Sequence, residues 1–410
     1  MTNYLLRNAT LIDGTGAAPV PDAAVLVDAG HIKWAGPASA APEHAGTTID
    51  LAGNTICPGF FDCHVHFGLP GTKGSVLGRV LKPASYAYFE LIERLRVTLH
   101  NGVTTARDLM GIDVGIREAV ADGLIEGPRL LVAVEMLSQT AGHADFHLRS
   151  GIDLTPMVGG YLVDSVDAAR THARALIAAG ADVIKVASSG GVSSPNDDPS
   201  WLGMRKDMIA AVVEEGRDYG GRPVAAHAIG RAGIAAAVEA GVHSVEHGYE
   251  LDDDLRAQMV TQGTFLVPTL LETMQPVTAS PQGAAKSAKW HAMAHDSIRA
   301  SAEAGVRIAV GTDAGLSPDH GTNLKELGLL VQFGGLTPMQ AIVAGTRTSA
   351  QLCGVDAEVG TVEAGKIADL VVVRGDPLAD ISALGDPANI LLVVQGGRAA
   401  SNRGGFATPA

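Results

Sequence analysis

Cysteine is scarce in this sequence, and long apolar runs are missing. The three cysteines, Cys57, Cys63 and Cys353, are odd in number and have no CxxC spacing. This argues against a disulfide framework and a thiolate zinc site, so we expect three small, buried apolar residues. No run reaches the length of a transmembrane helix. The first residues lack the basic segment and apolar core of a signal peptide, and we therefore expect a cytoplasmic protein.

Basic residues are too few to balance the acidic ones. The 410 residues include 30 Lys and Arg against 44 Asp and Glu, which gives a formal net charge of -14. Because this charge repels phosphate backbones and anionic lipids, we expect no nucleic acid and no membrane as partner, but a small-molecule substrate. Hydrophobic residues make up 46% of the chain, which indicates a folded protein with a large core. We also expect a homo-oligomer.

The hydrophobic pattern divides the chain into three parts. Residues 1–57 contain short β-like runs broken by Gly and Pro, residues 58–356 alternate apolar strands with Ala-rich amphipathic segments, and residues 357–410 return to short strands. The middle part predicts an α/β fold, a (β/α)8 TIM barrel, in preference to a doubly wound sheet. The two ends predict one small discontinuous β-sandwich domain. The eight predicted barrel strands are FFDCHVH (60–66), TTARD (104–108), RLLVAV (129–134), DVIKVAS (182–188), PVAAHA (223–228), SVEHG (244–248), TFLVPT (264–269) and RIAVGTD (307–313).

Two histidines end the first predicted strand, one residue apart. Residues i and i+2 of a strand share a face, so His64 and His66 point into the barrel while Val65 points to the helices. Two buried imidazoles need partners, and a divalent metal ion would satisfy both nitrogens. The HxH spacing alone leaves two satisfied or exposed histidines as the alternative.

Other predicted strands also end in residues that bind metals or support catalysis. They are Lys185, His227, His247 and Asp313. Because the carboxyl ends of barrel strands form the active-site mouth, these six side chains together predict a metal centre there.

Lys185 is flanked by Val and Ile on an inner strand, and burial there lowers the pKa of its amine. A neutral amine could form a Schiff base with a carbonyl, or add carbon dioxide to become a carbamate that bridges two cations. A lysine paired with a core carboxylate is the structural alternative. The surrounding histidines favour the carbamate, because a metal pair needs negative charge that histidine does not supply.

Two other histidine patterns carry less weight. HSVEH (243–247) matches a helical zinc-protease pattern, but the glycines on either side indicate a strand. His291 and His295 lie four residues apart on a predicted helix, where a solvated face is the simpler interpretation.

These residues resemble the amidohydrolase superfamily of metal-dependent hydrolases, in its binuclear form. The resemblance covers nearly the whole chain, from ATLIDGTG near the start to GTVEAGKIADLVVVRGDPL near the end. The motifs GVTTARDL, AGHAD, IKVASSGGVSSPNDDP, AAHAIG, SVEHG and GTDAG are similar to the imidazolonepropionase-like and Xaa-Pro dipeptidase-like branch.

The resemblance implies roles for individual residues. His64 and His66 would hold the more buried metal ion, His227 and His247 the second, and carboxylated Lys185 (N6-carboxylysine) would bridge them. Asp313 would contact the first ion, and His143 would contact the substrate. Ile229 stands where close peptidase relatives often carry Tyr, a departure that weakens an assignment to ordinary dipeptides. The implied cofactors are two divalent ions, zinc first, with manganese, cobalt or iron as alternatives.

The expected reaction is hydrolysis of a small peptide-like, N-acyl or aryl amide by a metal-bridging hydroxide. Asp313 would act as general base, and His143 would stabilise the oxyanion. The long loops 68–87, 138–163, 189–204 and 270–290 would cover the substrate, with Arg149, Tyr161 and Ile229 as further candidate contacts. The alternatives are a urea, carbamate or cyclic-amide hydrolase, a Schiff-base lyase acting through Lys185, and an inactive scaffold.

Overall fold

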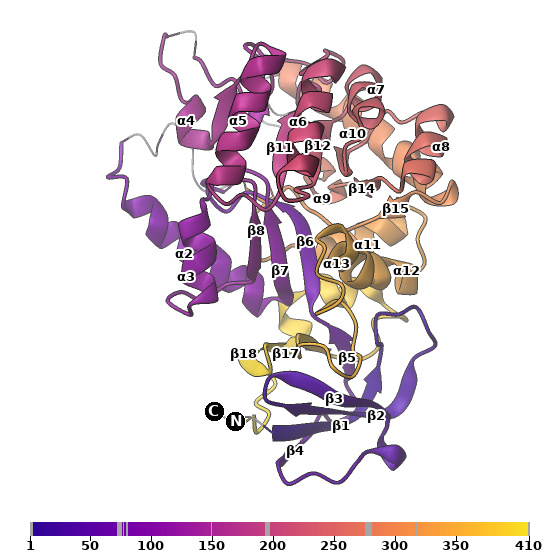
Figure 1. Ribbon diagram of the computed structural model, residues 1–410. Helices are drawn as coiled ribbons and strands as arrows, with labels where there is room; N and C mark the ends of the chain where they lie inside the picture. The colour runs from indigo at the N-terminus through magenta and orange to yellow at the C-terminus, as the bar shows by residue number, and fades with distance from the viewer. Residues whose placement is uncertain are drawn as a thin grey trace.

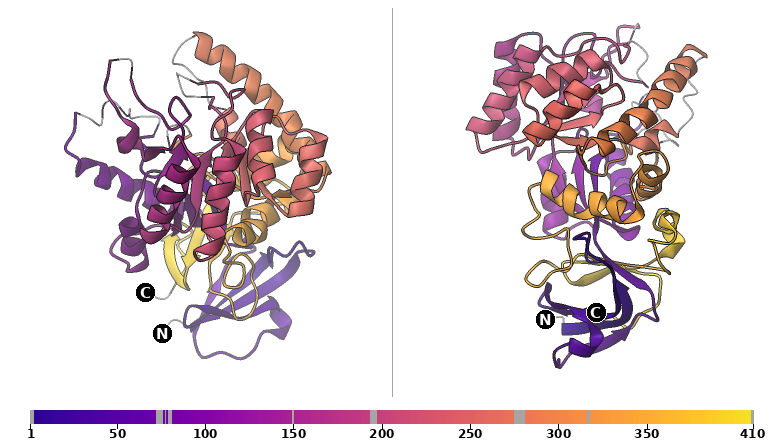
Figure 2. Two further views of the ribbon diagram at one scale, coloured as in Figure 1. Left: turned by 45° about the horizontal axis from the view of Figure 1, so that its top comes forward. Right: turned by 90° about the vertical axis from the view of Figure 1, so that its right-hand side faces the viewer.

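The computed structural model describes residues 3–71, 76, 78, 81–148, 150–192, 197–274, 281–315 and 318–408. These residues form a mixed α/β structure in which helices surround parallel strands, and a separate small sheet lies at one end with both chain termini near it (Figures 1 and 2). None of the described helices combines the length and apolar character needed to cross a bilayer.

Parallel strands form two sheets in the larger part. One contains three strands in the order β6-β7-β8, and the other contains seven in the order β10-β9-β11-β12-β13-β14-β15. The bounds are β6 Phe60–Val65, β7 Val103–Asp108, β8 Arg129–Val132, β9 Met136–Ser138, β10 Gly160–Leu162, β11 Ile184–Ala187, β12 Val224–Ala228, β13 Ser244–His247, β14 Phe265–Val267 and β15 Arg307–Ile308. Most of these strands are buried on both faces, which explains their nearly continuous apolar sequences.

Hydrogen bonds join the two parallel sheets at both edges. Asp182 N donates to Val132 O over 2.9 Å, which links the end of β8 to the residues before β11. On the other side, Cys63 N donates to Val310 O and His66 N to Ala314 O, each over 2.7 Å. The segment after β15 therefore lies directly beside β6.

Helices follow most of these strands and cover their outer faces. Several begin at side-chain caps; for example, Ser165 accepts from Ala168 N, and Asp252 accepts from Leu255 N. The bounds are α2 Tyr86–His100, α3 Val114–Ala121, α4 Thr155–Val158, α5 Val166–Ala178, α6 Lys206–Asp218, α7 Arg231–Ala240, α8 Asp253–Gln262, α9 Leu270–Thr273, α10 Pro281–Glu303, α11 Lys325–Gln332, α12 Pro338–Val343 and α13 Ser349–Leu352, with a π-helical turn at Ala344–Thr348.

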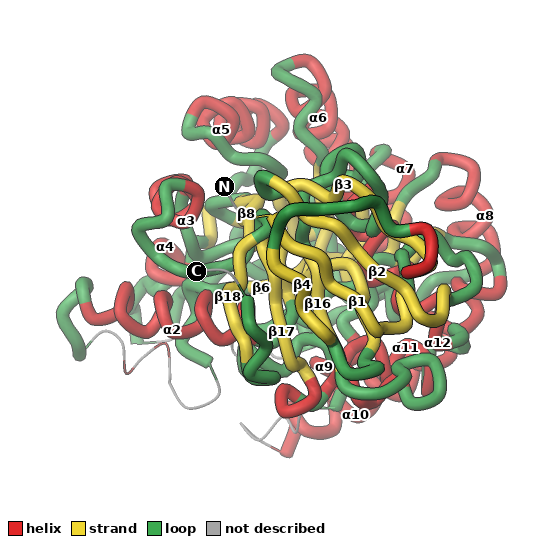
Figure 3. Tube along the Cα trace, turned by 90° about the horizontal axis from the view of Figure 1, so that it is seen from below, coloured by secondary structure: helices red, strands yellow, loops and turns green. Residues whose placement is uncertain are grey.

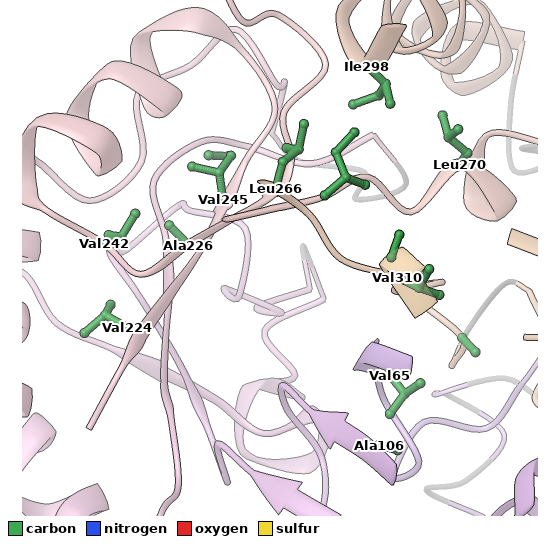
Figure 4. Packing of buried hydrophobic residues seen from close by; sticks show 14 of the residues in the cluster. Val65, Ala106, Val224, Ala226, Val242, Val245, Leu266, Leu270, Ile298 and Val310 are labelled. Carbon is green, nitrogen blue, oxygen red and sulfur yellow. The ribbon is translucent and has the colours of Figure 1, made fainter. Parts of the chain in front are cut away.

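The main core lies between these strands and helices. Outward-facing strand residues such as Val65, Ala226 and Val245 share one buried cluster with Ile298 of α10 (Figure 4). Burial of each Val or Ile side chain in this cluster contributes about 1.5–3 kcal/mol, so the core holds the strand ends in fixed relative positions.

The small sheet combines both ends of the chain. Its order is β18-β17-β16-β5-β1-β2-β3, with β4 on β1 (Figure 3). The bounds are β1 Asn3–Leu11, β2 Val20–Asp28, β3 His31–Pro37, β4 Thr47–Asp50, β5 Thr55–Pro58, β16 Leu370–Val373, β17 Ile390–Gln395 and β18 Arg398–Asn402. Antiparallel pairing of β5 with β16 joins the two ends, and a second apolar cluster lies under them.

The structure confirms the predicted α/β class with parallel strands. Each of the eight predicted barrel strands overlaps an observed strand, although only Arg307–Ile308 of RIAVGTD is strand, and the last four residues of HSVEH form strand β13. The prediction missed β9 and β10, which lie within the stretch expected to be loop at 138–163 or next to it, because three-residue strands are too short to show alternation. The barrel closure, the sandwich and the domain bounds stay predictions.

Candidate metal centre and active site

Four imidazoles from three strands converge in the larger part of the molecule. The ring centroid of His64 lies 5.3 Å from that of His66 and 5.1 Å from that of His247. The ring centroids of His247 and His227 are 4.6 Å apart. All four side chains are buried. The structure thus brings together the histidines that the sequence selected at the ends of β6, β12 and β13.

The backbone positions these rings through strand register and unusual conformations. In the β12–β13 ladder, His227 is opposite Glu246 and Ala228 is opposite His247. His247 and Asp313 adopt positive φ values of 73° and 60°, which are costly for residues with a side chain and are typical of functional sites.

Asp62 fastens β6 to the segment that carries Asp313. Its carboxylate accepts from Thr312 Oγ1 over 2.6 Å and from Asn323 Nδ2 over 2.7 Å. It also accepts from the backbone N of His64 over 3.1 Å. Burial raises the pKa of Asp62 to about 6 in spite of these hydrogen bonds.

Hydrogen bonds fix the tautomers of His64 and His66. His64 Nδ1 lies 3.0 Å from Glu246 Oε2, and His66 Nδ1 lies 3.0 Å from Met110 O. A carboxylate and a carbonyl can only accept, so each ring carries its proton on Nδ1. The Nε2 of His64 therefore keeps its lone pair for the centre of the site, whereas the Nε2 of His66 lies 3.0 Å from Asp313 Oδ1.

The other two rings are held in the same way. His227 Nε2 lies 3.0 Å from Gly190 O, so this ring presents Nδ1. His247 Nδ1 lies 2.8 Å from Thr269 Oγ1, and this hydroxyl lies 2.7 Å from Pro268 O. Because Pro268 O takes the hydroxyl proton, Thr269 accepts from His247, and His247 presents Nε2. His64, His227 and His247 thus each keep one lone pair, as a metal ligand must.

Burial keeps three of the rings neutral by lowering the pKa of His64, His227 and His247 well below the usual value. His66 differs. Burial favours its neutral form, but a 3.0 Å hydrogen bond to Asp313 Oδ1 outweighs it and raises the pKa of His66. The pKa of Asp313 falls to about 2, since the nearby His64 and His66 outweigh its burial.

Possible ligand atoms of His64, His66 and Asp313 all lie within 4.8 Å of one another, a spacing that can hold a metal ion. Lys185 Nζ adjoins this group at 3.4 Å from His64 Nε2. Burial lowers the pKa of Lys185 to about 8, although the charges of Glu246 and Asp313 oppose this. Nitrogen and oxygen donors without thiolates suit zinc and neighbouring divalent metals.

A buried ion pair that the sequence analysis missed lies under His64. Arg107 Nη2 is 2.9 Å from Glu246 Oε1, while the other oxygen of Glu246 faces His64. Arg107 Nε also donates to Cys63 O over 2.6 Å. Both side chains are almost fully buried. The available signal was a charged residue inside each of two apolar strands, in TTARD and SVEH.

His143 lies over the rings, at the mouth of the site. It stacks on His227 with centroids 3.9 Å apart, and its Nδ1 is 3.3 Å from Asp197 Oδ2. Lys286 of α10 donates to Gly191 O over 3.1 Å and to Asp197 O over 3.0 Å. The segment that carries Asp197 is therefore held beside His143.

Three further predicted contacts have different outcomes. Tyr161 stacks on His172 of α5 with ring centroids 3.4 Å apart and is 43% exposed, so its ring faces the helix layer. Ile229 is buried in the main apolar core. Arg149 lies outside the described residues, as do parts of the predicted substrate loops.

Comparisons with known proteins agree with this geometry. A model of the amidohydrolase family matches residues 55–400. An ochratoxinase from Aspergillus niger is 33% identical over 411 residues, covering 95% of this chain and 84% of the relative. An imidazolonepropionase from Cereibacter sphaeroides is 27% identical, covering 92% and 94%. The crystal structure of a Xaa-Pro dipeptidase with bound methionine in the active site superposes with a TM-score of 0.86, at 30% identity, covering 97% and 99%.

Proposed function

The chain belongs to the amidohydrolase family, and from this premise we propose that it is a metal-dependent hydrolase of an amide C–N bond in a small peptide-like, N-acyl or aryl amide. One observation carries the proposal: four buried imidazoles converge, and three of them, His64, His227 and His247, each donate one ring N–H outward and keep one lone pair for the centre.

We infer that residues 58–356 form a closed (β/α)8 barrel. The hydrogen bonds that join β8 to the start of β11 and β6 to the segment after β15 support closure. Residues 1–57 and 357–410 would form the small discontinuous β-sandwich domain, which the pairing of β5 with β16 supports.

The ligand set fits two divalent ions, with zinc as the first choice. His64, His66 and Asp313 would hold one ion, and His227 and His247 the other. Lys185, as N6-carboxylysine, would lie between them and add negative charge. When bound, such ions lower the pKa of water toward neutrality and polarise a carbonyl.

The protein's own groups would orient the substrate and move protons. Asp313, whose side chain is 25% exposed, would take the proton of the attacking water on a carboxylate oxygen and deliver it to the leaving nitrogen. His143, held by Asp197, would donate to the oxyanion. The relative named as a Xaa-Pro dipeptidase supports a peptide-like amide as substrate. We further propose a cytoplasmic homo-oligomer without nucleic-acid or membrane partners, consistent with the charge of -14.

The test is metal removal and restoration with a substrate panel. Chelated protein should lose turnover of N-acyl amino acids, Xaa-Pro and other dipeptides or anilides, and zinc, manganese or cobalt should restore it. Turnover of ureas, carbamates or cyclic amides alone would move the assignment to the alternative hydrolase class. Activity unchanged by chelation, with borohydride trapping of a carbonyl compound on Lys185, would instead indicate the Schiff-base lyase. Protein that binds no metal would indicate a scaffold.

A further inference from the structure

Two of the three cysteines meet in the core although 290 residues separate them in sequence. Cys63 Sγ and Cys353 Sγ lie 3.8 Å apart, and Cys63 Sγ is 3.9 Å from Ser349 O. Cys63 belongs to β6, and Cys353 directly follows α13, which lies beside β6 (Figure 1). The sequence predicted three buried cysteines without a disulfide, but Cys353 is only partly buried.

We propose that Cys63 and Cys353 form a reversible modification site, which low-molecular-weight disulfides such as oxidised glutathione convert into an intramolecular disulfide. The two sulfurs are already in van der Waals contact. A disulfide requires about 2.05 Å between sulfurs, so β6 and the end of α13 must approach further by roughly 2 Å. Cys57, buried in β5, is the unpaired third thiol that serves as an internal reference.

Partial exposure makes Cys353 the thiol that an oxidant reaches first. Its thiolate attacks oxidised glutathione, forms a mixed disulfide and releases one glutathione thiolate. The sulfur of Cys63 then attacks the sulfur of Cys353, and its proton leaves with the second glutathione. Two protein thiols are oxidised and one glutathione disulfide is reduced. The hydrogen bond with Cys63 lowers the pKa of Cys353 against the effect of burial, and the nearby charge of Arg107 adds to this.

The Cys63–Cys353 disulfide would also affect the hydrogen bonds that position His64. Cys63 O accepts from Arg107 Nε over 2.6 Å, and Arg107 pairs with Glu246, which in turn holds His64. Movement of Cys63 toward α13 disturbs the first of these contacts. We therefore expect the oxidised protein to hold metal less firmly, a consequence that rests on the proposed function, whereas the disulfide itself does not.

Peptide mapping tests the modification. The full-length protein is incubated in glutathione buffers, digested with trypsin and chymotrypsin, and analysed by mass spectrometry. Cleavage at Phe61 separates Cys57 from Cys63. The expected product is a Cys63–Cys353 cross-linked peptide that a reductant removes, with Cys57 free. Cys57→Ala should keep the cross-link and Cys353→Ala should abolish it. A mixed disulfide of Cys353 with glutathione alone, or a cross-link found only in denatured protein, overturns the proposal.

Metal transfer to a chelator tests the consequence. Oxidised protein should release metal at least tenfold faster than reduced protein, and the Cys353→Ala variant treated in the same way should show no change. Unchanged release from cross-linked protein overturns the coupling to His64. Reduced protein without bound metal would instead contradict the proposed function, and the peptide map would still decide whether the disulfide forms.

Discussion

Lys185 Nζ lies 3.4 Å from His64 Nε2, and both side chains are about 1% exposed. If His64 Nε2 binds a cation, as we propose, the charged form of an amine this close to it would be disfavoured, because two like charges in a buried site repel each other. The geometry therefore suits a neutral or carboxylated Lys185 in the metal-loaded protein.

Replacement of Lys185 by Ala should remove most of the bound metal. The anionic bridge would be lost, and short carboxylic acids such as acetate should partly restore metal content by occupying its place. Elemental analysis of purified protein, with and without acetate, measures the effect. Lys206→Ala is the matched control, because Lys206 forms only a surface ion pair with Glu239. Full metal content in the Lys185 variant would exclude the bridging role.

Replacement of Glu246 by Gln should weaken metal binding roughly 10- to 100-fold, the usual effect of losing a group that orients a ligating histidine. A Gln side chain can present its NH2 to His64 Nδ1 and so favour the tautomer that has its proton on Nε2. Competition with a chelator measures the change. The variant also leaves Arg107 buried without its carboxylate partner, so thermal unfolding of metal-free protein must be recorded alongside. Equal metal affinity in both proteins would contradict the orienting role.

Replacement of His143 by Ala should lower kcat roughly 100- to 1000-fold while metal content stays unchanged, the size of effect found when one oxyanion donor is removed. Asp197→Asn, which alters the partner of His143 and also a carboxylate that accepts from Gly191 N over 3.0 Å, should have a smaller effect. His147→Ala is the control, because His147 lies a few residues away in an exposed pair with Asp145. Loss of metal from the His143 variant would instead indicate a ligand role.

The sequence predicted the strands and the types of residue that gather at the candidate site because both depend on local pattern. Alternation of apolar strands with Ala-rich segments located the eight strands, and their last polar residues included His64, His227 and His247. Long-range pairing was not predictable in this way. The partnership of Arg107 with Glu246 joins residues 139 positions apart, and nothing local to either residue identifies the other. Local pattern also did not indicate how Tyr161 lies: it belongs to the three-residue strand β10, and its ring stacks on His172 of α5.

Glu326 gives a stability prediction that is independent of the metal centre. Its buried carboxylate accepts from Leu270 N over 2.8 Å and Leu271 N over 2.6 Å, where α9 begins. Burial raises the pKa of Glu326 from 4.5 to about 8 against the effect of these bonds. Between these values the folded protein binds more protons than the unfolded chain. The free energy of unfolding should therefore fall as pH rises from about 4.5 to 8, by at most about 1.4 kcal/mol per pH unit from this group.

Glu326→Gln removes this titration, so its unfolding free energy should depend less on pH than that of the wild type. Denaturant unfolding at pH 5, 6.5 and 8 measures the unfolding free energy of both proteins. The value for the variant minus that for the wild type should increase by roughly 2–4 kcal/mol from pH 5 to pH 8. Glu239→Gln, which alters an exposed carboxylate, should follow the wild-type profile. Other buried acids such as Asp108 titrate in all three proteins and cancel in the comparison. Parallel profiles for the wild type and Glu326→Gln would mean that Glu326 is ionised in the folded protein at pH 5, with its two backbone donors outweighing the burial.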